Sequence, residues 1–415
     1  MILHVWLVNP FDPLPGGPEP PGRYATLATM LAERGHQVLW WTSAFSHRFH
    51  RYLDQPAAEE ACRRAGIEVR FLPVPAYRWN VSLGRLWNHY LLSRRFVCQA
   101  SAEPRRPDVI VASTPPPGLA RSVARIAGQR KVPLVLDVQD LWPETFSRLS
   151  PTWLRPVFDL ATLPMRRSAR RACQAATAIV GVADGYVEHA VRLGGAKAVT
   201  RTVPLGVDLA AFDAATEAGG GGRFLKPHGE TWLVYAGSLT RSYDCLTVLH
   251  AAVMLRDRKD LRFFLAGRGE LEEPIRRIIA DHRLENVTLT GFLDPPACFG
   301  LMRQCDIGIN SCLPEAMILL PNKLFAYLAA GLAVLNAIPG QCSRIVNQAW
   351  CGLDYRPGDA ASCAAAIMEL IEDDCELEVM RRSARKLAED VYDRRKLYAQ
   401  YVDLIEAGAR SAAER

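Results

Sequence analysis

The sequence lacks any uninterrupted apolar run of about 20 residues, the length that spans a bilayer. It begins with MILHVWLVNPFDP, which has neither a basic start nor a small-residue cleavage site, so we predict a first β-strand there and not a signal peptide. Its eleven cysteines form no CxxC pair and no Cys/His spacing typical of zinc sites. We therefore expect no bound metal, and thiols buried in a protein of the reducing cytoplasm.

The sequence also lacks a strong excess of positive or of negative charge. The net charge of +6 is only mildly basic, and we expect no nucleic-acid partner. With 49% apolar and 23% charged residues the composition is typical of globular proteins. A chain of 415 residues suits two domains of roughly 200 residues each.

Strand-like apolar runs alternate with helical patterns along the chain, which predicts an α/β fold with two doubly wound, mostly parallel sheets. The predicted strands are 2–8, 37–43, 68–74, 108–114, 134–140 and 178–183 in the first half, and 231–237, 262–267, 286–291, 307–311 and 333–337 in the second.

The segment EAGGGGR (217–223) interrupts this series and predicts a linker or a flexible loop. We predict an N-terminal domain over 1–216, a C-terminal domain over 224–391, and a last helix within 392–415 whose packing the sequence leaves open. Two such domains place a ligand cleft between them, at the carboxyl ends of both sheets.

Two loops of the first half carry candidate ligand-binding residues. After the first strand, Gly16 and Gly17 let the backbone approach a ligand, and the helix that starts near Arg23 offers free N–H groups to an anion. The alternative is a surface loop, and the G-x-G-x-x-G spacing of a dinucleotide site is absent. In DVQDLWPETF, Asp140 beside Trp142 suits binding of sugar hydroxyls; the alternative is a capping Asp140 and a core Trp142.

Three segments of the second half predict phosphate binding. In YAGSLTR a strand, a glycine turn and a helix direct N–H groups at a phosphate, and Arg241 adds a charge. LAGRGELEE repeats this pattern, and a purely structural turn is the alternative for both. In LPNKLFAYLAAG, Pro321 suits a first helical turn, Lys323 places a cation beside its free N–H groups, and Gly331 ends the helix. This helix N-terminus predicts a diphosphate site.

Taken in order, several segments resemble the family 4 retaining glycosyltransferases, which have the two-domain GT-B fold: GGPEPPGRYATLATMLAERGHQV, STPPPG with LVLDVQDLWPE, VPLGVDLAAF, YAGSL and PNKLFAYLAAGLAVL. The chain is most similar to the subgroup that builds bacterial surface polysaccharides on lipid carriers. The resemblance implies that the second domain binds a nucleotide-sugar, usually a uridine diphosphate sugar, and that the first binds the acceptor. It also implies that the protein needs no metal and no cofactor besides this donor substrate.

The resemblance further implies roles for particular residues. Arg241 and Lys323 would act on the diphosphate and Asp140 at the transferred sugar. The remaining candidates for the donor site are Gly16, Gly17, Gly237, Ser238, Gly267, Phe292, Glu315, Pro321, Asn322 and Ala326.

The sequence departs from the family at the donor site. Ser238 and Tyr243 stand where many members carry two cations, and the family's paired glutamates align with Ile318 and Ala326. The second glutamate usually holds the ribose hydroxyls. For Ala326 the explanations are a natural loss of activity, an altered donor or compensation by Glu315, a deliberate substitution, and a purely structural alanine.

We therefore predict a retaining glycosyltransferase of cell-surface polysaccharide biosynthesis. It would move a hexosyl or N-acetylhexosaminyl group from a UDP-sugar to a lipid-linked or saccharide acceptor. Two alternatives stay open: a binding or scaffold protein that kept the fold without catalysis, and a nucleotide-sugar epimerase of the same architecture.

The segment 151–172 predicts a cytoplasmic protein that attaches peripherally to an anionic membrane surface. Apolar residues such as Trp153 and Leu160 precede a cluster of arginines at 166, 167, 170 and 171. The alternative is a core helix with a solvated basic face.

Overall fold

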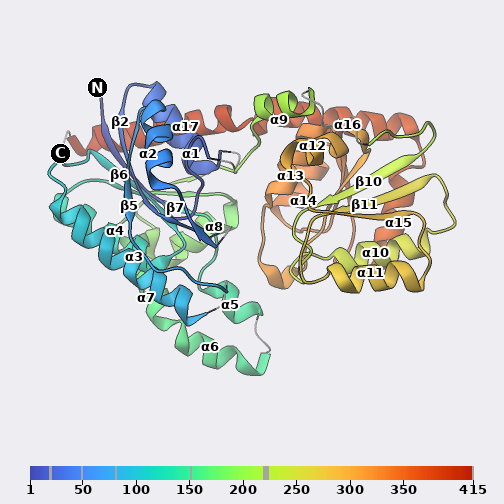
Figure 1. Cartoon of the computed structure of the whole chain (residues 1–415), viewed down its shortest axis with the longest axis horizontal. Coiled ribbons are helices and arrows are strands. Elements are labelled where there is room, and N and C mark those ends of the chain that lie inside the picture. Colours follow the sequence, from blue (N-terminus) through green and yellow to red (C-terminus); the bar gives the residue numbers. More distant parts are fainter. Residues whose placement is uncertain (18–20, 48–49, 80–81, 150–151, 218–223, 414–415) are drawn as a thin grey trace. The chain divides into compact units, whose positions relative to one another are not determined.

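The computed structural model describes residues 1–17, 21–47, 50–79, 82–149, 152–217 and 224–413. The chain divides into two compact units, unit 1 over Met1–Pro204 with Leu397–Arg415, and unit 2 over Leu205–Lys396. Each unit has its own parallel sheet with helices on both faces (Figure 1). This confirms the predicted α/β class with two doubly wound sheets.

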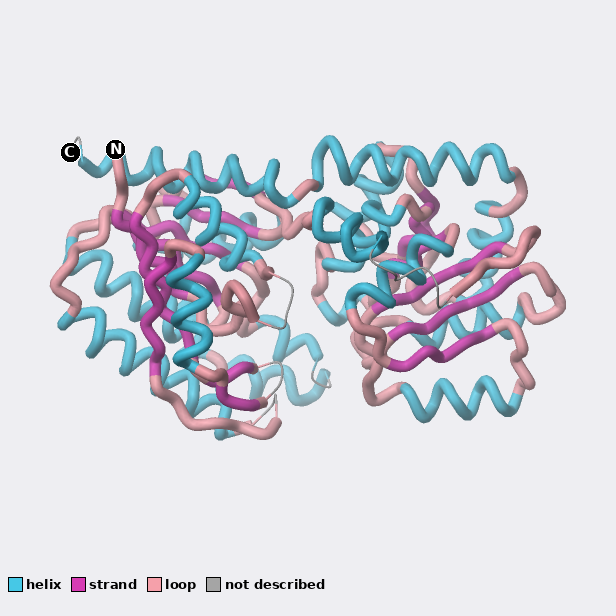
Figure 2. The backbone as a smooth tube through the Cα atoms, turned by 45° about the horizontal axis from the view of Figure 1, so that its top comes forward, coloured by secondary structure: helices cyan, strands magenta, loops and turns pink. Residues whose placement is uncertain are grey.

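In unit 1 the parallel strands follow the order β5-β2-β1-β6-β7-β8-β9. Figure 2 shows the strands of both units in magenta and the helices that cover them in cyan. The order reverses at β1, so the carboxyl ends of β1 and β6 flank a topological switch point. A short antiparallel hairpin, β3 with β4, lies outside this sheet. The bounds are β1 His4–Val8, β2 Gln37–Ser43, β3 Phe45–Ser46, β4 Arg51–Tyr52, β5 Ile67–Leu72, β6 Val109–Thr114, β7 Leu134–Val138, β8 Ala178–Gly181 and β9 Val199–Thr202.

Helices cover both faces of this sheet because alternate strand residues point to opposite sides. On one face Leu27 of α1 belongs to the same buried cluster as Tyr401 of α17, so the last helix of the chain, whose packing the sequence left open, completes unit 1. On the other face Phe96 of α3 shares a cluster with Val123 of α4. The helices are α1 Arg23–Glu33, α2 Gln55–Arg64, α3 Leu83–Ala102, α4 Pro117–Arg130, α5 Glu144–Leu149, α6 Arg155–Ala161, α7 Leu163–Ala175, α8 Asp184–Ala190 and α17 Arg394–Ala413.

Unit 2 repeats the doubly wound arrangement with the strand order β12-β11-β10-β13-β14-β15, so its switch point lies between β10 and β13. The strands are β10 Thr231–Ala236, β11 Leu261–Ala266, β12 Val287–Gly291, β13 Ile307–Asn310, β14 Ala333–Asn336 and β15 Gly352–Asp354. The helices are α9 Leu209–Ala215, α10 Cys245–Met254, α11 Glu272–Asp281, α12 Pro295–Gln304, α13 Asn322–Ala330, α14 Gln341–Gln348, α15 Ala360–Leu370 and α16 Asp374–Leu387. In Figure 1, α10 and α11 lie on one face of this sheet and α12 and α13 on the other.

The division between the units falls earlier in the chain than the predicted boundary at 216. Phe212 of α9 packs on Phe299 of α12 with 4.6 Å between ring centroids, and Asp213 pairs with Arg385 at 2.8 Å. Residues 205–216 therefore belong to unit 2, because this helix buries its apolar side on the second core. Of the predicted linker 217–223, all but the first residue lies outside the described residues, and the chain on both sides belongs to unit 2.

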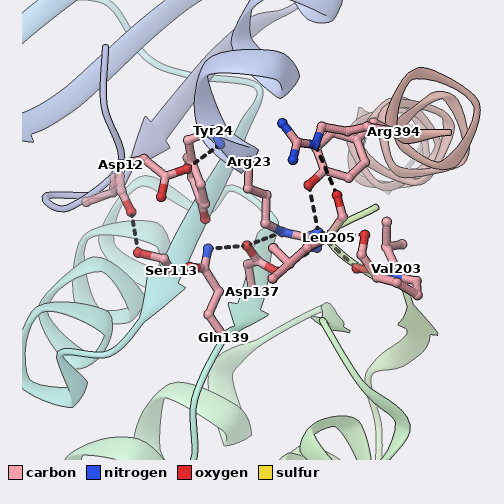
Figure 3. A network of polar contacts seen from close by, with 12 residues as sticks. Asp12, Arg23, Tyr24, Ser113, Asp137, Gln139, Val203, Leu205 and Arg394 are labelled. Carbon is pink, nitrogen blue, oxygen red and sulfur yellow. Dashed lines mark hydrogen bonds and ion pairs between the residues drawn. The ribbon is translucent and has the colours of Figure 1, made fainter. Parts of the chain in front are cut away.

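A buried ion pair connects the first helix of unit 1 to the centre of its sheet (Figure 3). Arg23 donates from Nε and Nη2 to the two oxygens of Asp137, each at 2.9 Å, and both side chains are almost fully excluded from solvent. Its Nη1 donates to the carbonyl oxygen of Val203 at 2.9 Å. The rings of Tyr398 and Tyr401, both on α17, lie 5.2 and 4.9 Å from the guanidinium carbon. One arginine thus joins α1, β7 and α17.

We expect Arg23→Met to lower the free energy of unfolding by about 3–5 kcal/mol, because the carboxylate of Asp137 would stay buried without its partner. Urea denaturation followed by circular dichroism measures this loss. The double variant Arg23→Met with Asp137→Leu should be less destabilised than Arg23→Met alone. Simple addition of the two single losses would contradict a coupled pair.

Candidate active site

Three neighbouring strands of unit 2 end in glycines at the carboxyl edge of the sheet. The N–H of Gly237 donates to the carbonyl oxygen of Ala266, and that of Gly267 donates to Gly291, each at 2.9 Å. A Cβ on Gly267, whose φ is 154°, would lie 1.8 Å from the carbonyl oxygen of Gly237. Glycine is therefore required at position 267 for the two loops to pack together. This packing gives the LAGRG turn a structural role, which is the alternative to phosphate binding.

Helix α13 begins beside the switch point of unit 2, and Tyr327 holds it there. The ring of Tyr327 fills the space over Gly308 of β13, where a Cβ would approach it to 2.5 Å. Its hydroxyl accepts a hydrogen bond from the N–H of Ala236, the last residue of β10, at 2.9 Å. Sequence reasoning missed Tyr327, although it stands four residues after Lys323 on the same side of the helix.

The side chain of Lys323 is buried, with the whole residue only 9% exposed, and its Nζ has no hydrogen-bond partner in the described part of the chain. The Nζ lies 3.8 Å from the ring centroid of Tyr235 and 4.0 Å from that of Tyr243. These cation–π contacts offset only part of the loss of hydration. Burial accordingly lowers the pKa of Lys323 to about 7.

The first turn of α13 adds further donors to this place. Its N-cap is Pro321, which supplies no side-chain acceptor to the first N–H groups. No carboxylate of the described residues pairs with Lys323, so the donors and the ammonium face no anion of the protein's own. Backbone donors and a cation gathered in this way are suited to bind a phosphate or diphosphate.

The loop after β10 encloses the lysine. A Cβ on Gly237 would lie 3.4 Å from the Nζ, so this predicted residue does border the site. The carbonyl oxygen of Ser238 accepts from the hydroxyl of Tyr235 at 2.7 Å, which fixes the ring beneath the ammonium. Tyr243, which occupies a position where many family members carry a cation, covers the ammonium from another side.

Other predicted donor-site residues lie on the surface of unit 2. The side chain of Arg241 is 86% exposed, and its backbone N–H donates to Oε1 of Glu270 at 3.1 Å. Phe292, after β12, and Glu315, in the 3-10 turn Pro314–Ala316, are exposed as well. In the described residues no contact joins Arg241, Phe292 or Glu315 to Lys323, so their roles at a donor stay predictions.

Ala326 is part of the accessible side of α13. Every residue of this helix is buried except Asn322, which is exposed, and Ala326, which is half-buried. Residues four apart lie on the same side of a helix, so the two form one stripe next to the first turn. A side chain longer than alanine at position 326 would therefore extend along this stripe and not into the core.

In unit 1 the start of α1, where the sequence predicts N–H groups free to bind an anion, already has a carboxylate partner. The N–H of Tyr24 donates to Oδ2 of Asp12 at 2.6 Å, so a carboxylate of the protein itself occupies the helix N-terminus (Figure 3). The N–H of Gly17 is also used, since it donates to the carbonyl oxygen of Leu14 at 3.3 Å. Gly16 and Gly17 nevertheless line a pocket of about 420 Å³, so a role near a sugar stays a prediction.

Asp140 organises its own loop. Its Oδ1 accepts from the N–H of Leu141 at 2.7 Å and its Oδ2 from the indole N–H of Trp142 at 3.0 Å. Burial raises the pKa of Asp140. Trp142 is half-buried and packs edge-on against Phe146, with 4.6 Å between centroids. The two contacts of Asp140 lie within the loop before α5, which begins at Glu144, and action of Asp140 on a sugar stays a prediction.

The cysteines differ in part from expectation. All eleven are free, and eight of them are buried, but Cys98 and Cys375 are exposed. Within the described ranges, no three residues of the His, Cys, Asp and Glu types gather in a way that could hold a metal ion. A search of the same ranges finds no helix with the length and apolarity of a membrane span.

Comparison with protein families settles the class of the protein. Residues 21–206 match the family model described as a glycosyl transferase 4-like domain, and residues 230–373 match the model of glycosyl transferases group 1. The chain belongs to the GT4-type glycosyltransferases. Among curated proteins, none matches it at a significant level.

Solved structures resemble this glycosyltransferase over nearly its whole length. HepE of Anabaena, in complex with UDP, has a TM-score of 0.69 at 17% identity and covers 98% of this chain and 100% of its own. Sucrose-phosphate synthase from Thermosynechococcus elongatus has a TM-score of 0.68 at 15% identity, covering 98% of each chain. WaaG, a glycosyltransferase involved in lipopolysaccharide biosynthesis, has 0.65 at 15% identity, covering 97% and 99%. These likenesses confirm the GT-B fold.

For Lys323→Met we expect at least tenfold weaker binding of inorganic diphosphate at pH 7, measured by calorimetry. As the pH rises above about 7 Lys323 loses its charge, so the ratio of the affinity of the unaltered protein to that of the variant should fall; the ionisation of diphosphate itself affects both proteins alike. The melting temperature of the free variant should not fall, because a buried ammonium is removed. Arg256→Gln is the control. Equal affinity in Lys323→Met and the unaltered protein would exclude contact between Nζ and the anion.

Proposed function

We propose that this glycosyltransferase moves a sugar from a nucleoside diphosphate-sugar, with uridine as the nucleoside, to a lipid-linked or saccharide acceptor. The observation that carries the proposal is the buried ammonium of Lys323, which has no hydrogen-bond partner among the described residues and lies at the N-terminus of α13, where no side chain caps the helix. A diphosphate would accept hydrogen bonds from the N–H groups and favour the charged form of the lysine. The complexes of HepE with UDP and with UDP-glucose support uridine as the nucleoside.

In the proposed reaction the bond between the anomeric carbon and the diphosphate oxygen breaks. The acceptor hydroxyl forms its bond to this carbon on the same face, so that the anomeric configuration is retained. The leaving diphosphate takes the hydroxyl proton, and no side chain has to act as a base. Lys323 and the N–H groups of α13 would stabilise the charge that develops on the leaving group.

The biological setting is part of the same proposal. We infer a hexosyl or N-acetylhexosaminyl donor and a place in cell-surface polysaccharide biosynthesis on the cytoplasmic side of the membrane. Support comes from the DLWPE and PNKLF segments and from the likeness to WaaG, whose own role is in lipopolysaccharide biosynthesis. A binding protein without catalysis is the second candidate, favoured by Ala326, since no carboxylate of α13 can hold a ribose.

The donor can be identified with a thermal-shift panel of UDP-, GDP- and ADP-sugars. A ligand at 100 times its Kd stabilises the folded protein by about 2.7 kcal/mol, so a UDP-sugar should raise the melting temperature while the others do not. Release of free sugar or transfer product with catalytic amounts of protein would separate the enzyme from the binding protein. If no nucleotide-sugar shifts the melting curve, the proposal fails.

The same panel on Ala326→Glu tests the accessible stripe of α13. A carboxylate there would accept from the ribose hydroxyls, and we expect at least tenfold tighter donor binding, since charge-assisted hydrogen bonds contribute about 1.5–3 kcal/mol each. Ala326→Gln is the matched control without the charge. Unchanged affinity in a folded Ala326→Glu protein would show that position 326 does not face the donor.

We further propose that unit 1 attaches to an anionic membrane surface. Trp153, Val157 and Leu160, at and near α6, are 60–76% exposed. Of the four predicted arginines, Arg166 is engaged with Asp159 at 2.6 Å, so only the other three on α7 are available. Because Pro156 and Pro164 lie in the first turns of separate helices, the segment forms α6 and α7 and not one continuous helix.

Replacing Arg167, Arg170 and Arg171 with glutamine should weaken co-sedimentation with phosphatidylglycerol vesicles by at least tenfold. Each basic residue near an anionic surface contributes about 1 kcal/mol, which salt screens. The control variant removes three exposed arginines of unit 2, namely Arg256, Arg277 and Arg283. If both triple variants lost vesicle binding equally, the net charge of the protein would explain the loss, and the proposed membrane surface on unit 1 would be contradicted.

A further inference from the structure

The helices α3, α4 and α7 carry an unusual concentration of charge. Together they contain ten arginines and not one aspartate or glutamate, although the whole chain has a net charge of only +6. The three helices pack side by side on one face of the sheet of unit 1 (Figure 1). The remainder of the chain must therefore be net negative, and this face is a distinct basic surface.

A groove of about 660 Å³ lies among these three helices. Such a volume is in the range of small-molecule sites. The side chains that line it come from the same sides of the helices, at spacings of three and four residues, and include Arg94 of α3 and Arg121 of α4. None of the lining residues is acidic.

One stretch of the groove wall is basic. Arg94, Arg121 and Arg125 line it and are exposed, and in the described part of the chain no side chain or carbonyl group pairs with them. Arg121 and Arg125 stand four residues apart on α4, where like charges repel. An anion bound between the arginines would relieve this repulsion.

The other stretch of the groove is apolar and continues onto an exposed hydrophobic surface. Leu86 and Tyr90 of α3 line the groove and are 46% and 51% exposed. Next to them, Trp87 stacks on Tyr90 with 5.3 Å between ring centroids, and Leu83 is 83% exposed. Aromatic and aliphatic side chains beside a basic region are typical of surfaces at the membrane–water boundary.

A buried histidine connects the groove to the carboxyl edge of the sheet. His89 lines the groove, and its Nε2 has no partner among the described residues. Its ring lies 5.7 Å from that of Phe11 and 5.8 Å from that of Trp142, which belong to the loops after β1 and β7. Phe11 also lines the pocket that contains Gly16 and Gly17. The groove is thus next to the edge where we expect the acceptor.

We propose that this groove binds one anionic phospholipid of the membrane, with its phosphate among Arg94, Arg121 and Arg125 and its acyl chain along Leu86 and Tyr90. The order of the two stretches fits a phospholipid. The apolar stretch, which would contact the acyl chain, continues to Leu83 and Trp87 at the start of α3, and Arg94, which would contact the phosphate, lies further toward the end of this helix. The bound lipid would hold the acceptor edge of unit 1 at the membrane surface. The inference rests on the proposed function at a membrane-linked acceptor.

The chain itself provides a reporter for the groove. Cys98 lines it and is exposed, and the other exposed cysteine, Cys375, belongs to unit 2. Monomeric dihexanoyl phosphatidylglycerol should slow alkylation of Cys98 at least tenfold and leave Cys375 unaffected, as read by mass spectrometry of the full chain. Dihexanoyl phosphatidylcholine, which has the same chains without net charge, and inorganic phosphate, which has no chain, should protect Cys98 weakly.

The double variant Arg121→Gln with Arg125→Gln should lose this protection at least tenfold. Arg95→Gln is the matched control, because Arg95 is exposed on α3 but does not line the groove. Several results would overturn the inference: equal protection by phosphatidylcholine or by phosphate, equal loss in Arg95→Gln, or stronger protection by farnesyl diphosphate, which would mark the groove as an acceptor site.

A melting curve with UDP-sugar on each variant separates this inference from the proposed function. If the UDP-sugar still raises the melting temperature and the phospholipid gives no protection, the groove inference alone fails. If the unaltered protein shows no shift with any nucleotide-sugar, the proposed function fails, whatever the lipid does.

Discussion

The proposed chemistry of unit 2 depends on the burial of one ammonium group, that of Lys323, which has no anionic partner among the described residues. Burial of Lys323 disfavours the charged form of its side chain, because the ammonium loses its hydration. The cation–π contacts with Tyr235 and Tyr243 compensate for only part of this loss. Such an arrangement stabilises no fold by itself. It is consistent with a group held ready for a ligand that brings the missing negative charge.

The surrounding packing keeps the lysine in this unfavourable place. Tyr327 anchors α13 to the end of β10, and the glycines at 237 and 267 let two loops pass within van der Waals contact of each other. These residues are buried or conformationally restricted, and together they surround Lys323 with protein atoms, so that burial lowers the pKa of its ammonium group to about 7. A fixed charge of this kind is what electrostatic stabilisation of a leaving group requires, which is the role that we propose for Lys323.

Unit 1 is built on the opposite principle. Its central arginine is paired with Asp137, and an N–H group at the start of its first helix donates to Asp12, so a carboxylate of the protein itself satisfies each of these groups. Its excess of positive charge lies instead on α3, α4 and α7, which contain ten arginines and no aspartate or glutamate of their own. Such a distribution supports the proposal that unit 1 attaches to an anionic surface through these helices.

The sequence by itself determined the class, the strands and the helix that carries Lys323, because these depend on short-range patterns. Apolar runs at strand spacing, the proline at 321 and the glycine stop at 331 are local signals, and all reappear in the structure. The structure added β9 and β15, which are only four and three residues long and follow no long apolar run.

Only the tertiary structure decided which candidates are available to a ligand, since availability depends on partners far away in the chain. Asp12 closes a helix N-terminus that looked open, and Tyr243 covers a lysine eighty residues later in the sequence. Helix α9 packs on the second core although a glycine run follows it, and α17 returns to the first. Burial, pairing and the grouping of arginines on neighbouring helices arise from contacts between distant segments, which no local pattern contains.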